Sequence, residues 1–449
     1  MTRRRSLSGG VRVPASLEVI RLRLDALAFG GEAVGRESTG RVVFVTGGAP
    51  GDLVDVRLTE TKRSFARGEI AALVEPGPAR QAAPCPVQDR CGGCPWQHVS
   101  DGVQHETKLN IVRRALSRTE AVVRPLLTAP AALGYRTRVR LTLRGPRAGF
   151  LGRRSHELVE VASCIALDAR LDAAVSVART VLAPHLITHS DEEGHLEGLV
   201  APDGRVHLGL ELMRTNGPLL AAAESLPGQA GIIGVAVRWP RHHRVFGESE
   251  LEVEPGFFGS ATGFAQANHA QNLVLRRLVT EALFGTSSDE PRILELHAGD
   301  GNFSRDLVTR ARLCAVESEP RAGQRLLENL RRVAPRVPTE PSRWTTRSES
   351  AERACAQLIA AGEHFDLVLL DPPRVGAEEL MALLPALQPR RVVYVSCDPM
   401  TLGRDLASLE KRGYRTVSAQ PIDMVPQTSH IETVAVLDRT MDEATPSPP

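Results

Sequence analysis

The sequence of 449 residues contains no apolar run long enough to cross a membrane as a helix. Residues 1–10 are rich in arginine, but the apolar stretch of a secretory leader does not follow them. The seven cysteines are too sparse for the disulfide framework of a small secreted protein. These absences argue against membrane and secreted proteins, and we expect a cytoplasmic monomer with no membrane partner.

Lysine is also scarce, so most of the positive charge is carried by arginine, which prefers planar, bidentate contacts with phosphate groups. The formal net charge is only +2. The charge balance therefore permits a nucleic-acid partner without requiring one. Hydrophobic residues make up 42% of the chain, which is enough to fill proper cores, and the length predicts two or three domains.

Three regions of the chain differ in their hydrophobic pattern. Residues 14–76 contain short runs of alternating apolar and polar residues between glycine-rich turns, which predict a small antiparallel β-barrel. One loop of this barrel carries Lys62, Arg63 and Arg67, a group that suits phosphate contacts but is also typical of a solvated hairpin. A proline-rich linker at residues 75–78 follows the barrel.

Residues 77–260 are expected to form a central, β-rich domain. Its strand at 135–143 alternates basic and apolar residues, so one face is rich in arginine, and we favour a track for an RNA backbone over a solvated edge. In residues 261–440 strands alternate with helices, which predicts an α/β domain with a doubly wound, mostly parallel sheet. The predicted strands of that sheet lie at residues 293–296, 313–317, 365–370, 391–395 and 433–437.

Three of the cysteines lie close together in the sequence, in a glycine-rich loop bordered by prolines. Cys85, Cys91 and Cys94 are separated by five and two residues, and such loops let several thiolates converge on one metal centre. A fourth ligand has to come from a distance, and Cys164 is the natural candidate. Because three ligands are local and one is distant, the pattern favours a four-iron cluster over zinc, and a metal-free structural loop is a third interpretation.

A single cysteine, Cys397, follows the apolar strand at 391–395 and precedes a helix. Asp398 is placed to cap that helix, and Pro399 suits its first turn. The partial positive charge at a helix start is expected to favour thiolate over thiol at Cys397. The alternative interpretation is a buried, unreactive cysteine.

The ends of the neighbouring strands carry residues that suit a nucleoside cofactor. Strand 293–296 is followed by Gly299 and Gly301, which allow a sharp turn and leave room for a ligand, but the third glycine of the nicotinamide pattern is absent. Glu317 ends the next strand, where a carboxylate can accept hydrogen bonds from both hydroxyls of a ribose. Asp371 ends another strand at the same edge. A glycine turn and two carboxylates without a phosphate-binding group suit S-adenosylmethionine better than a dinucleotide.

Together, these motifs resemble the S-adenosylmethionine-dependent RNA 5-methyluridine methyltransferases over nearly the whole chain. Residues 35–52 are similar to the TRAM domain of that family, and the four cysteines are similar to its 4Fe–4S site. The remaining matches are Phe264-Ala265-Gln266-Ala267-Asn268, Asp371-Pro372-Pro373-Arg374, Ser396-Cys397-Asp398-Pro399 and the segment from Asp423 to Glu432.

The resemblance implies an enzyme with a TRAM barrel, a cluster-bearing central domain and a Rossmann-like methyltransferase domain, which methylates carbon 5 of a uridine in structured RNA. Cys397 would add to carbon 6 of the uracil, and Glu432 would remove the proton from carbon 5. The combination of barrel and cluster favours 23S ribosomal RNA over transfer RNA as the partner. The implied cofactor-binding residues are Gln266, His297, Gly299, Gly301, Asn302, Glu317 and Asp371.

The sequence departs from the family pattern at a few positions. His297 and Ala298 stand where an aromatic residue followed by cysteine is usual, although His297 could still stack on or hydrogen-bond the cofactor. The residue that grips the adenine, near Ser348 or Glu349, is not identified. Asp371-Pro372-Pro373 carries no cysteine, unlike cytosine-methylating relatives, which argues for uracil.

Two other functions remain as alternatives. The departure at His297 would suit a non-catalytic RNA-binding protein whose cofactor pocket has decayed. An iron–sulfur redox protein is the other alternative, and the lack of a flavin motif or a second cluster motif argues against it.

Overall fold

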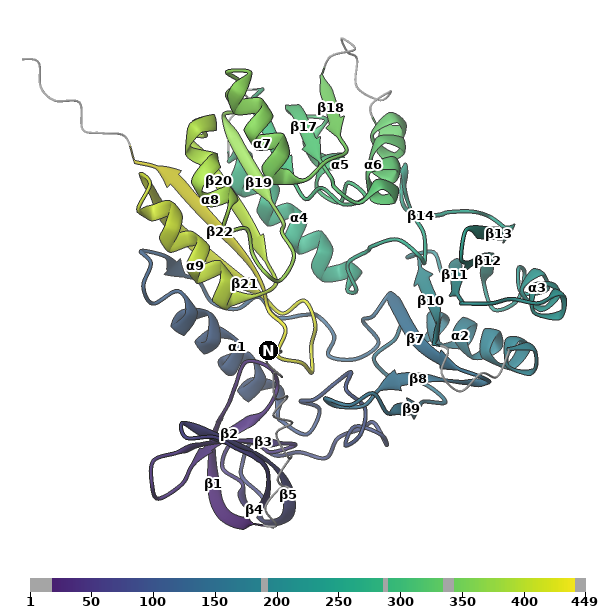
Figure 1. Ribbon diagram of the computed structural model, residues 1–449, viewed down its shortest axis with the longest axis vertical. Helices are drawn as coiled ribbons and strands as arrows, with labels where there is room; N and C mark the ends of the chain where they lie inside the picture. Colours follow the sequence, from purple (N-terminus) through teal and green to yellow (C-terminus); the bar gives the residue numbers. More distant parts are fainter. Residues whose placement is uncertain (1–17, 187–192, 286–289, 334–342, 441–449) are drawn as a thin grey trace, which may run out of the picture.

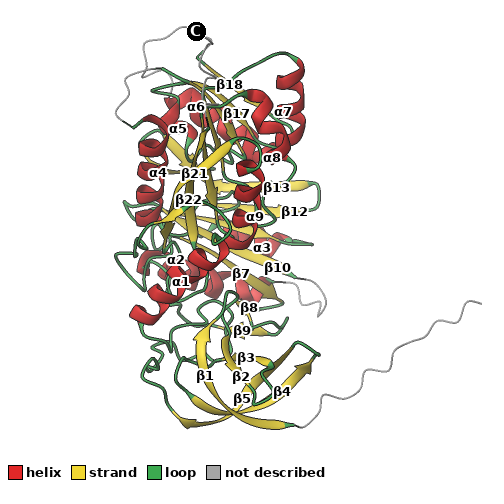
Figure 2. Cartoon of the chain, turned by 90° about the vertical axis from the view of Figure 1, so that its left-hand side faces the viewer, coloured by secondary structure: helices red, strands yellow, loops and turns green. Residues whose placement is uncertain are grey.

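The structure is a computed structural model that describes residues 18–186, 193–285, 290–333 and 343–440. A small barrel, a central sheet and a larger α/β domain follow one another along the long axis, with the barrel at the lower end (Figures 1 and 2). In the described part of the chain, no helix combines the length and the apolar character that crossing a bilayer demands.

The N-terminal barrel is closed and has the strand order β1-β2-β3-β5-β4. Alternate side chains such as Leu22 and Leu24 point inward and are 5% and 1% exposed, which confirms the predicted alternation. The expectation of a purely antiparallel barrel is wrong, because β3 and β5 pair in parallel to close it. The strands are β1 (Val19–Leu27), β2 (Ala33–Arg36), β3 (Val42–Thr46), β4 (Leu53–Thr61) and β5 (Phe65–Glu75).

The central sheet has seven strands in the order β13-β12-β11-β10-β7-β8-β9. One face packs its apolar residues against two helices, α2 (Ala169–Leu182) and α3 (Gly217–Glu224), and the opposite face carries mainly polar side chains. A short hairpin, β14 (Leu251–Glu254) with β15 (Phe257–Gly259), follows it. The seven strands are β7 (Arg138–Arg144), β8 (Arg147–Leu151), β9 (Leu158–Glu160), β10 (Gly194–Val200), β11 (Val206–Glu211), β12 (Ile232–Trp239) and β13 (His242–Gly247).

The α/β domain contains an eight-stranded sheet in the order β18-β17-β16-β19-β20-β22-β21-β6. Five consecutive strands, β18 to β20, are parallel, and β22 runs antiparallel to β20, so the predicted mostly parallel sheet is confirmed. The strands are β6 (Val122–Val123), β16 (Arg292–Leu296), β17 (Arg312–Val316), β18 (Trp344–Arg347), β19 (Leu367–Leu370), β20 (Arg391–Ser396), β21 (Tyr414–Ile422) and β22 (Glu432–Arg439).

Helices cover both faces of this sheet, as a doubly wound fold requires. One apolar cluster joins α1, α7, α8 and α9 to the sheet, and a second joins α4, α5 and α6 to the other face. The helices are α1 (Asp101–Ala115), α4 (His269–Phe284), α5 (Ser304–Leu307), α6 (Pro320–Val333), α7 (Ala351–Ala360), α8 (Leu380–Leu383) and α9 (Pro399–Glu410). Although α1 and β6 precede the central sheet in sequence, they pack on the α/β domain: α1 contributes Val112 to its core, and β6 pairs with β21.

Candidate functional site

The predicted site residues meet at one edge of the α/β sheet. Leu296 pairs with both Val316 and Leu370, and Leu370 pairs with Tyr394, so β16, β17, β19 and β20 end side by side. Their following residues include His297, Glu317, Asp371 and Cys397. The carboxyl ends of parallel strands are where such sheets bind ligands.

The register of the last strand brings the predicted base to the predicted nucleophile. Ser396 of β20 pairs with Thr433 of β22, and β22 begins at Glu432. Because the two strands are antiparallel, the next residue of β20, Cys397, lies across from the residue before Thr433, which is Glu432. The sheet therefore presents a thiol and a carboxyl group together at the cofactor edge.

The turn after β20 has the predicted helix cap. The carboxylate of Asp398 accepts hydrogen bonds from the backbone N–H groups of Met400 and Thr401, at 2.9 and 3.1 Å, and Pro399 is the first residue of α9. The hydroxyl of Thr401 donates to the carbonyl of Arg374 at 3.1 Å. The helix that starts beside Cys397 thus also fixes the loop that follows Asp371.

The expected activation of Cys397 by the helix start is wrong for the free protein. Burial raises the pKa of the Cys397 thiol to about 11, and the nearby carboxyl groups of Glu432 and Asp371 raise it further, against the opposing charge of Arg374. Desolvation and two acidic neighbours therefore outweigh a partial helix charge. At neutral pH the side chain of Cys397 is a thiol.

Two carboxyl groups share this end of the sheet. Burial raises the pKa of Asp371 to about 7, and burial together with the charge of Asp371 raises the pKa of Glu432 well above its ordinary value. Glu432 is only 6% exposed. Two close acidic groups cannot both ionise easily in a buried place, so the pair retains a proton near neutral pH.

The glycine turn after β16 is held by Glu317. Its carboxylate accepts the backbone N–H of Gly299 at 2.8 Å and that of Glu319 at 2.7 Å. Gly299 and Gly301 have φ values of 58° and 96°, which explains why glycine is needed there. No atom lies within 4 Å of where a Cβ of Gly299 would be, so this turn leaves open space.

His297 begins this turn with an unusual backbone for a side chain that bears a Cβ, a φ of 60°. Its Nε2 atom is buried and has no hydrogen-bond partner among the described residues. Burial lowers the pKa of His297, so the ring is neutral at physiological pH. A neutral ring with an unsatisfied nitrogen can donate to, or accept from, a ligand placed in the turn.

The structure gives less direct support for a cofactor contact by the other predicted residues. Asn302 exchanges two amide hydrogen bonds with Asn272, at 2.9 and 3.0 Å, so its side chain is already paired. Gln266 is half-buried in the segment that leads to α4. Of the two positions expected near the adenine, Glu349 pairs with Arg347 at 2.7 Å.

Sequence reasoning missed the anchor of the loop between β21 and β22. Lys108 of α1, fully buried, donates to the carboxylate of Asp423 at 2.5 Å and to the carbonyl of Val425 at 3.1 Å. Gln104, one helical turn earlier, donates to the side chain of Gln427 at 2.9 Å. The available signal was the spacing of four residues that places both polar side chains on the buried face of α1.

The same loop is held from the central domain and from α4. The hydroxyl of Tyr135 donates to the carbonyl of Pro426 at 3.0 Å. The side-chain amide of Asn268 donates to the carbonyl of Met424 at 3.2 Å. Trp96, two residues after Cys94, donates its backbone N–H to the carbonyl of Gln427 at 3.0 Å. The loop that precedes Glu432 is therefore tied to three other parts of the chain.

Glu295 is a second residue that the sequence interpretation missed. It lies in the apolar strand β16, is 1% exposed, and accepts a hydrogen bond from the hydroxyl of Ser304 at 2.6 Å. Burial raises the pKa of Glu295 to about 8, so it remains protonated at neutral pH. A carboxyl group within an otherwise apolar strand was the signal for it.

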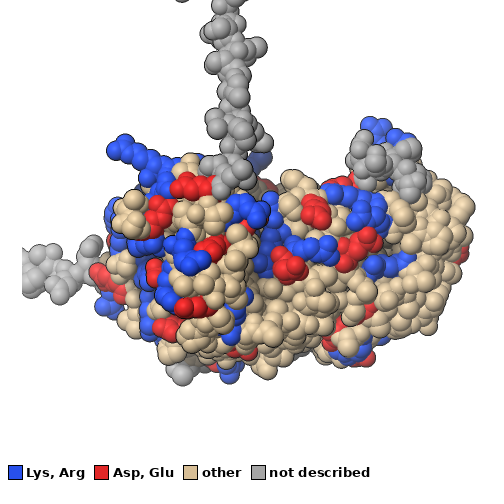
Figure 3. Space-filling model, turned by 90° about the horizontal axis from the view of Figure 1, so that it is seen from below, with Lys and Arg blue, Asp and Glu red and all other residues tan. Residues whose placement is uncertain are grey.

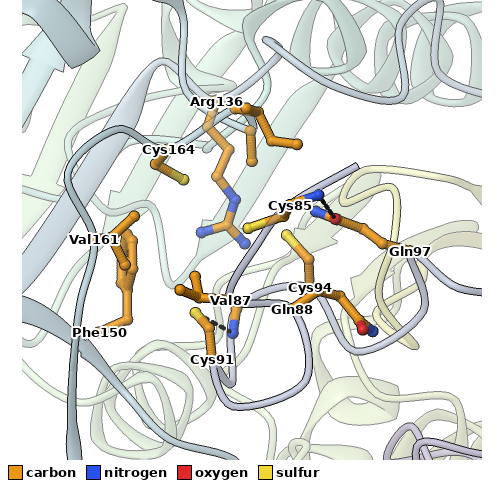
Figure 4. Close-up of a pocket in the computed structure, with 13 residues that line it drawn as sticks. Cys85, Val87, Gln88, Cys91, Cys94, Gln97, Arg136, Phe150, Val161 and Cys164 are labelled. Carbon is orange, nitrogen blue, oxygen red and sulfur yellow. Dashed lines mark hydrogen bonds between the residues drawn. The ribbon is translucent and has the colours of Figure 1, made fainter. Parts of the chain in front are cut away.

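The four cysteines predicted as metal ligands line one cavity (Figure 4). Cys85, Cys91 and Cys94 lie on one loop, Cys164 faces them from the other side, and all four are free thiols. The guanidinium group of Arg136 extends into the space between them. Sequence analysis had assigned this arginine to a strand surface, but β7 begins only at Arg138.

The donor set was compared with two kinds of metal centre. Within the described residues, no three His, Cys, Asp or Glu side chains are close enough to bind one metal ion. A tetrahedral zinc site needs four ligands about 2.0–2.3 Å from one point. Four thiols spread around a cavity that also holds a cationic group suit a larger, anionic iron–sulfur cluster better than a single ion.

The arginine-rich face predicted for the strand at 135–143 is largely neutralised. Arg138 lies 3.7 Å from Glu197, and Arg140 lies 3.1 Å from Glu211. In the barrel loop, Lys62 pairs with Glu60, whereas no ion pair involves Arg63 among the described residues. Seen from below, positive and negative side chains are likewise interspersed (Figure 3).

The chain is similar to known proteins in both sequence and fold. Two family descriptions match parts of the chain, the TRAM domain over residues 17–71 and Conserved hypothetical protein 95 over residues 276–420. An uncharacterized RNA methyltransferase of Gloeobacter violaceus is 33% identical, over 94% of this chain and 97% of its own.

A 23S rRNA (uracil(1939)-C(5))-methyltransferase of Pectobacterium atrosepticum is also 33% identical, over 90% of each chain. Among solved structures, the tRNA (uracil-54, C5)-methyltransferase of Pyrococcus abyssi, in complex with S-adenosyl-L-homocysteine, superposes with a TM-score of 0.71. That match covers 93% of this chain and 99% of the other at 21% identity, so it shows a shared fold.

Proposed function

This chain belongs to the S-adenosylmethionine-dependent RNA uracil-C5-methyltransferase family, and from that premise we propose that it methylates carbon 5 of a uridine in 23S ribosomal RNA. Two relatives, from Pectobacterium atrosepticum and Cronobacter sakazakii, carry the name 23S rRNA (uracil(1939)-C(5))-methyltransferase, and each is 33% identical to this chain. Transfer RNA is the second candidate substrate, favoured by the fold shared with the Pyrococcus abyssi enzyme.

Carbon 5 of uracil is too weak a nucleophile to take the methyl group unaided. A second nucleophile must therefore add to the ring first and activate carbon 5. After its thiol proton is lost to solvent, the sulfur of Cys397 forms a bond to carbon 6, and the ring becomes an enolate. Carbon 5 then takes the methyl group that S-adenosylmethionine supplies when bound. Glu432 removes the carbon 5 proton, and the carbon–sulfur bond breaks to return the thiolate.

One observation carries this assignment, the register of β20 with β22. The pairing of Ser396 with Thr433 implies that Cys397 and Glu432 face each other at the edge where ligands bind. The charge of Glu432 also contributes to the raised pKa of Cys397, which supports their closeness. Arg374 opposes that shift and favours the thiolate.

The cofactor is expected to lie in the turn after β16. Glu317, whose carboxylate is already oriented by two backbone N–H groups, would bind the ribose, and the open space at Gly299 would admit the ligand. His297 would offer its unsatisfied Nε2 atom. The complete set proposed for the cofactor is Gln266, His297, Gly299, Gly301, Asn302, Glu317 and Asp371.

We also propose that Cys85, Cys91, Cys94 and Cys164 hold a 4Fe–4S cluster, with Arg136 balancing its negative charge. The cluster would fasten the cysteine loop to the central domain. Because Trp96 of that loop hydrogen-bonds the loop before Glu432, the fastening would also steady the base.

The test is methyl transfer from labelled S-adenosylmethionine to total RNA that lacks 5-methyluridine, with the Cys397→Ala protein in parallel. Label recovered as 5-methyluridine in 23S RNA, and absent with Cys397→Ala, is the expected result. Label confined to transfer RNA would select the second substrate. No transfer to either RNA by a folded, cofactor-binding protein would contradict the proposed function.

A further inference from the structure

The polar face of the central sheet is open where it approaches the α/β domain. Leu141, Val235 and Val237 belong to the apolar core under α2 and α3, so alternate residues of the same strands point the other way. These include Arg140 and Arg238. In Figure 1 the hairpin of β12 and β13 lies on the right-hand side, to the right of and below α6.

A hollow of about 730 Å³ occupies this face, and we call it the hairpin groove. It is defined by Arg140, His195, Arg238, Trp239, Arg241, His242, His243 and Arg321, together with the rim residues Glu193, Glu211, Leu212, Met213 and Pro240. The groove thus brings together residues of β7, β10, β11, β12, β13 and α6.

The arginines of the hairpin groove are only partly neutralised. Its two acidic side chains already have partners, because Glu211 pairs with Arg140 at 3.1 Å and Glu193 pairs with an arginine of β7. Arg238 and Arg321 form no ion pair with a carboxylate among the described residues. Burial has the largest effect on the pKa of Arg238 and lowers it, the charges of Arg321 and Arg325 lower it further, and the more weakly acting carboxylates of Glu197 and Glu211 raise it.

Neighbouring guanidinium groups that form no ion pair are stabilised by an anion that bridges them. Phosphate fits this role because its oxygens accept paired N–H donors from each guanidinium plane. Two exposed histidines, His242 and His243, add further donors at the same rim. The groove therefore has the chemistry of a phosphate-binding surface.

At the turn of the hairpin the groove also meets an aromatic stack, whose Trp239 packs against the apolar core on the other side of β12. The rings of Trp239 and His242 are stacked, with centroids 5.6 Å apart and planes at 28°. His242 is exposed, so a nucleobase can continue the stack on its outer face. Phosphate donors beside a stacking platform are typical of surfaces that bind unpaired RNA.

The hairpin groove opens beside the cofactor edge. Arg321 stands at the start of α6, four residues after Glu317, whose carboxylate holds the glycine turn. We propose that the hairpin groove binds the sugar–phosphate backbone and one unstacked base of the RNA strand that flanks the target uridine. The inference rests on the proposed function for the identity of that RNA.

The test compares RNA binding by a double variant and by a matched control. Arg238→Gln with Arg321→Gln removes two charges from the hairpin groove, and Arg147→Gln with Arg277→Gln removes two from exposed ion pairs elsewhere. Fluorescence anisotropy with a transcript of 23S RNA, without cofactor, is followed as salt is raised. We expect the groove variant to bind about tenfold more weakly and its salt slope to fall by about 0.7 per arginine, with the control unchanged.

The stacking contact is tested separately by His242→Ala. This change should weaken binding and leave the salt slope unchanged, because stacking releases no counterions. On a short RNA hairpin that carries the target uridine in its loop but no flanking strand, the kcat of the double variant and of His242→Ala should match that of the original protein, because such a substrate offers no strand for the groove to bind.

Three outcomes would overturn the inference. The first is an equal loss of RNA binding in the groove variant and the control variant. The second is an equal loss of activity on the short hairpin and on the long transcript. The third is displacement of the bound transcript by polyglutamate but not by unlabelled RNA. If no RNA were methylated while the groove variants still lost binding to the transcript, the proposed reaction would be contradicted, whereas the assignment of the hairpin groove as an RNA-binding surface would be supported.

Discussion

Lys108 of α1 donates to the carboxylate of Asp423 at 2.5 Å, across 315 positions of sequence. Both side chains are buried, at 0% and 3% exposure. Burial lowers the pKa of Lys108, while the charge of Asp423 raises it. The pair fixes the loop that leads to Glu432, so α1 contributes to the site without reaching its reacting atoms.

Removal of this lysine should be costly. In Lys108→Met the buried carboxylate of Asp423 would lose its ammonium partner and keep, among the described residues, only His105, 3.4 Å away, and the loss of one member of a buried pair costs about 3–5 kcal/mol. We expect a lower melting temperature and reduced kcat, measured by thermal unfolding and methyl transfer. Lys108→Met with Asp423→Asn is the matched control and should recover much of the stability, and equal stability of the single variant and the original would contradict the role.

Loss of the proposed base should trap an intermediate. In Glu432→Gln no carboxylate removes the carbon 5 proton, so the bond from Cys397 to carbon 6 cannot break. Incubation with RNA and S-adenosylmethionine should therefore yield a protein–RNA band in a denaturing gel. The band should be absent when Cys397→Ala is added to the same protein, and normal turnover by Glu432→Gln would exclude Glu432 as the base.

The reaction rate should rise with pH from about 6 to 8. The reaction requires Cys397 without its proton and an ionised carboxyl group, and burial raises the pKa values of Cys397 and Asp371 to about 11 and 7. Lower pH therefore protonates the carboxyl pair as well as the thiol. The check is kcat/KM against pH, corrected for stability, and a rate that falls across this range would contradict the assignment.

Glu295 should make stability depend on pH. Its pKa is raised from the ordinary value of 4.5 to about 8, so its contribution to stability is complete below pH 4.5 and is lost as pH rises through 8. Glu295→Gln carries no such charge. We expect the variant to be the more stable protein above pH 8, by on the order of a few kcal/mol, and to lose that advantage near pH 5. Thermal unfolding at the two pH values measures this, and a difference independent of pH would contradict it.

The cysteine cavity should yield iron and acid-labile sulfide in roughly equal amounts when the protein is purified without oxygen. Cys164→Ser should lose most of both, because it removes the ligand that faces the other three. Cys314→Ala, which changes a cysteine of the α/β core, is the control and should retain them. One zinc per chain without sulfide would instead identify a zinc site.

Local patterns predicted five strands of the α/β sheet and the alternation in the barrel. Alternation along β1 and the apolar runs of β16, β19 and β20 are visible in the sequence because each strand buries its own side chains. The parallel pairing of β3 with β5, the edge strand β18 and the strand β21 were missed. All three depend on which strands become neighbours, and this is set by the assembly of a sheet rather than by any local run.

The candidate site divides in the same way. Asp398 was predicted as a cap because capping is local, and its hydrogen bonds confirm it. The pKa of Cys397 was predicted in the wrong direction, since its largest influences are burial and carboxyl groups brought by other strands. Arg136 in the cysteine cavity could not be foreseen either, because the cavity is assembled from segments that are far apart.

The order of the eight-stranded sheet has a consequence for synthesis of the protein. β22 is the last strand along the chain, yet it lies between β20 and β21, and β6 joins the sheet only through β21. Until β22 emerges from the ribosome, β21 and β6 have no place in the sheet, and the backbone N–H and C=O groups along the edge of β20 stay unpaired. The strand that completes the sheet also delivers Glu432, so a growing chain gains its base only in the step that closes its fold.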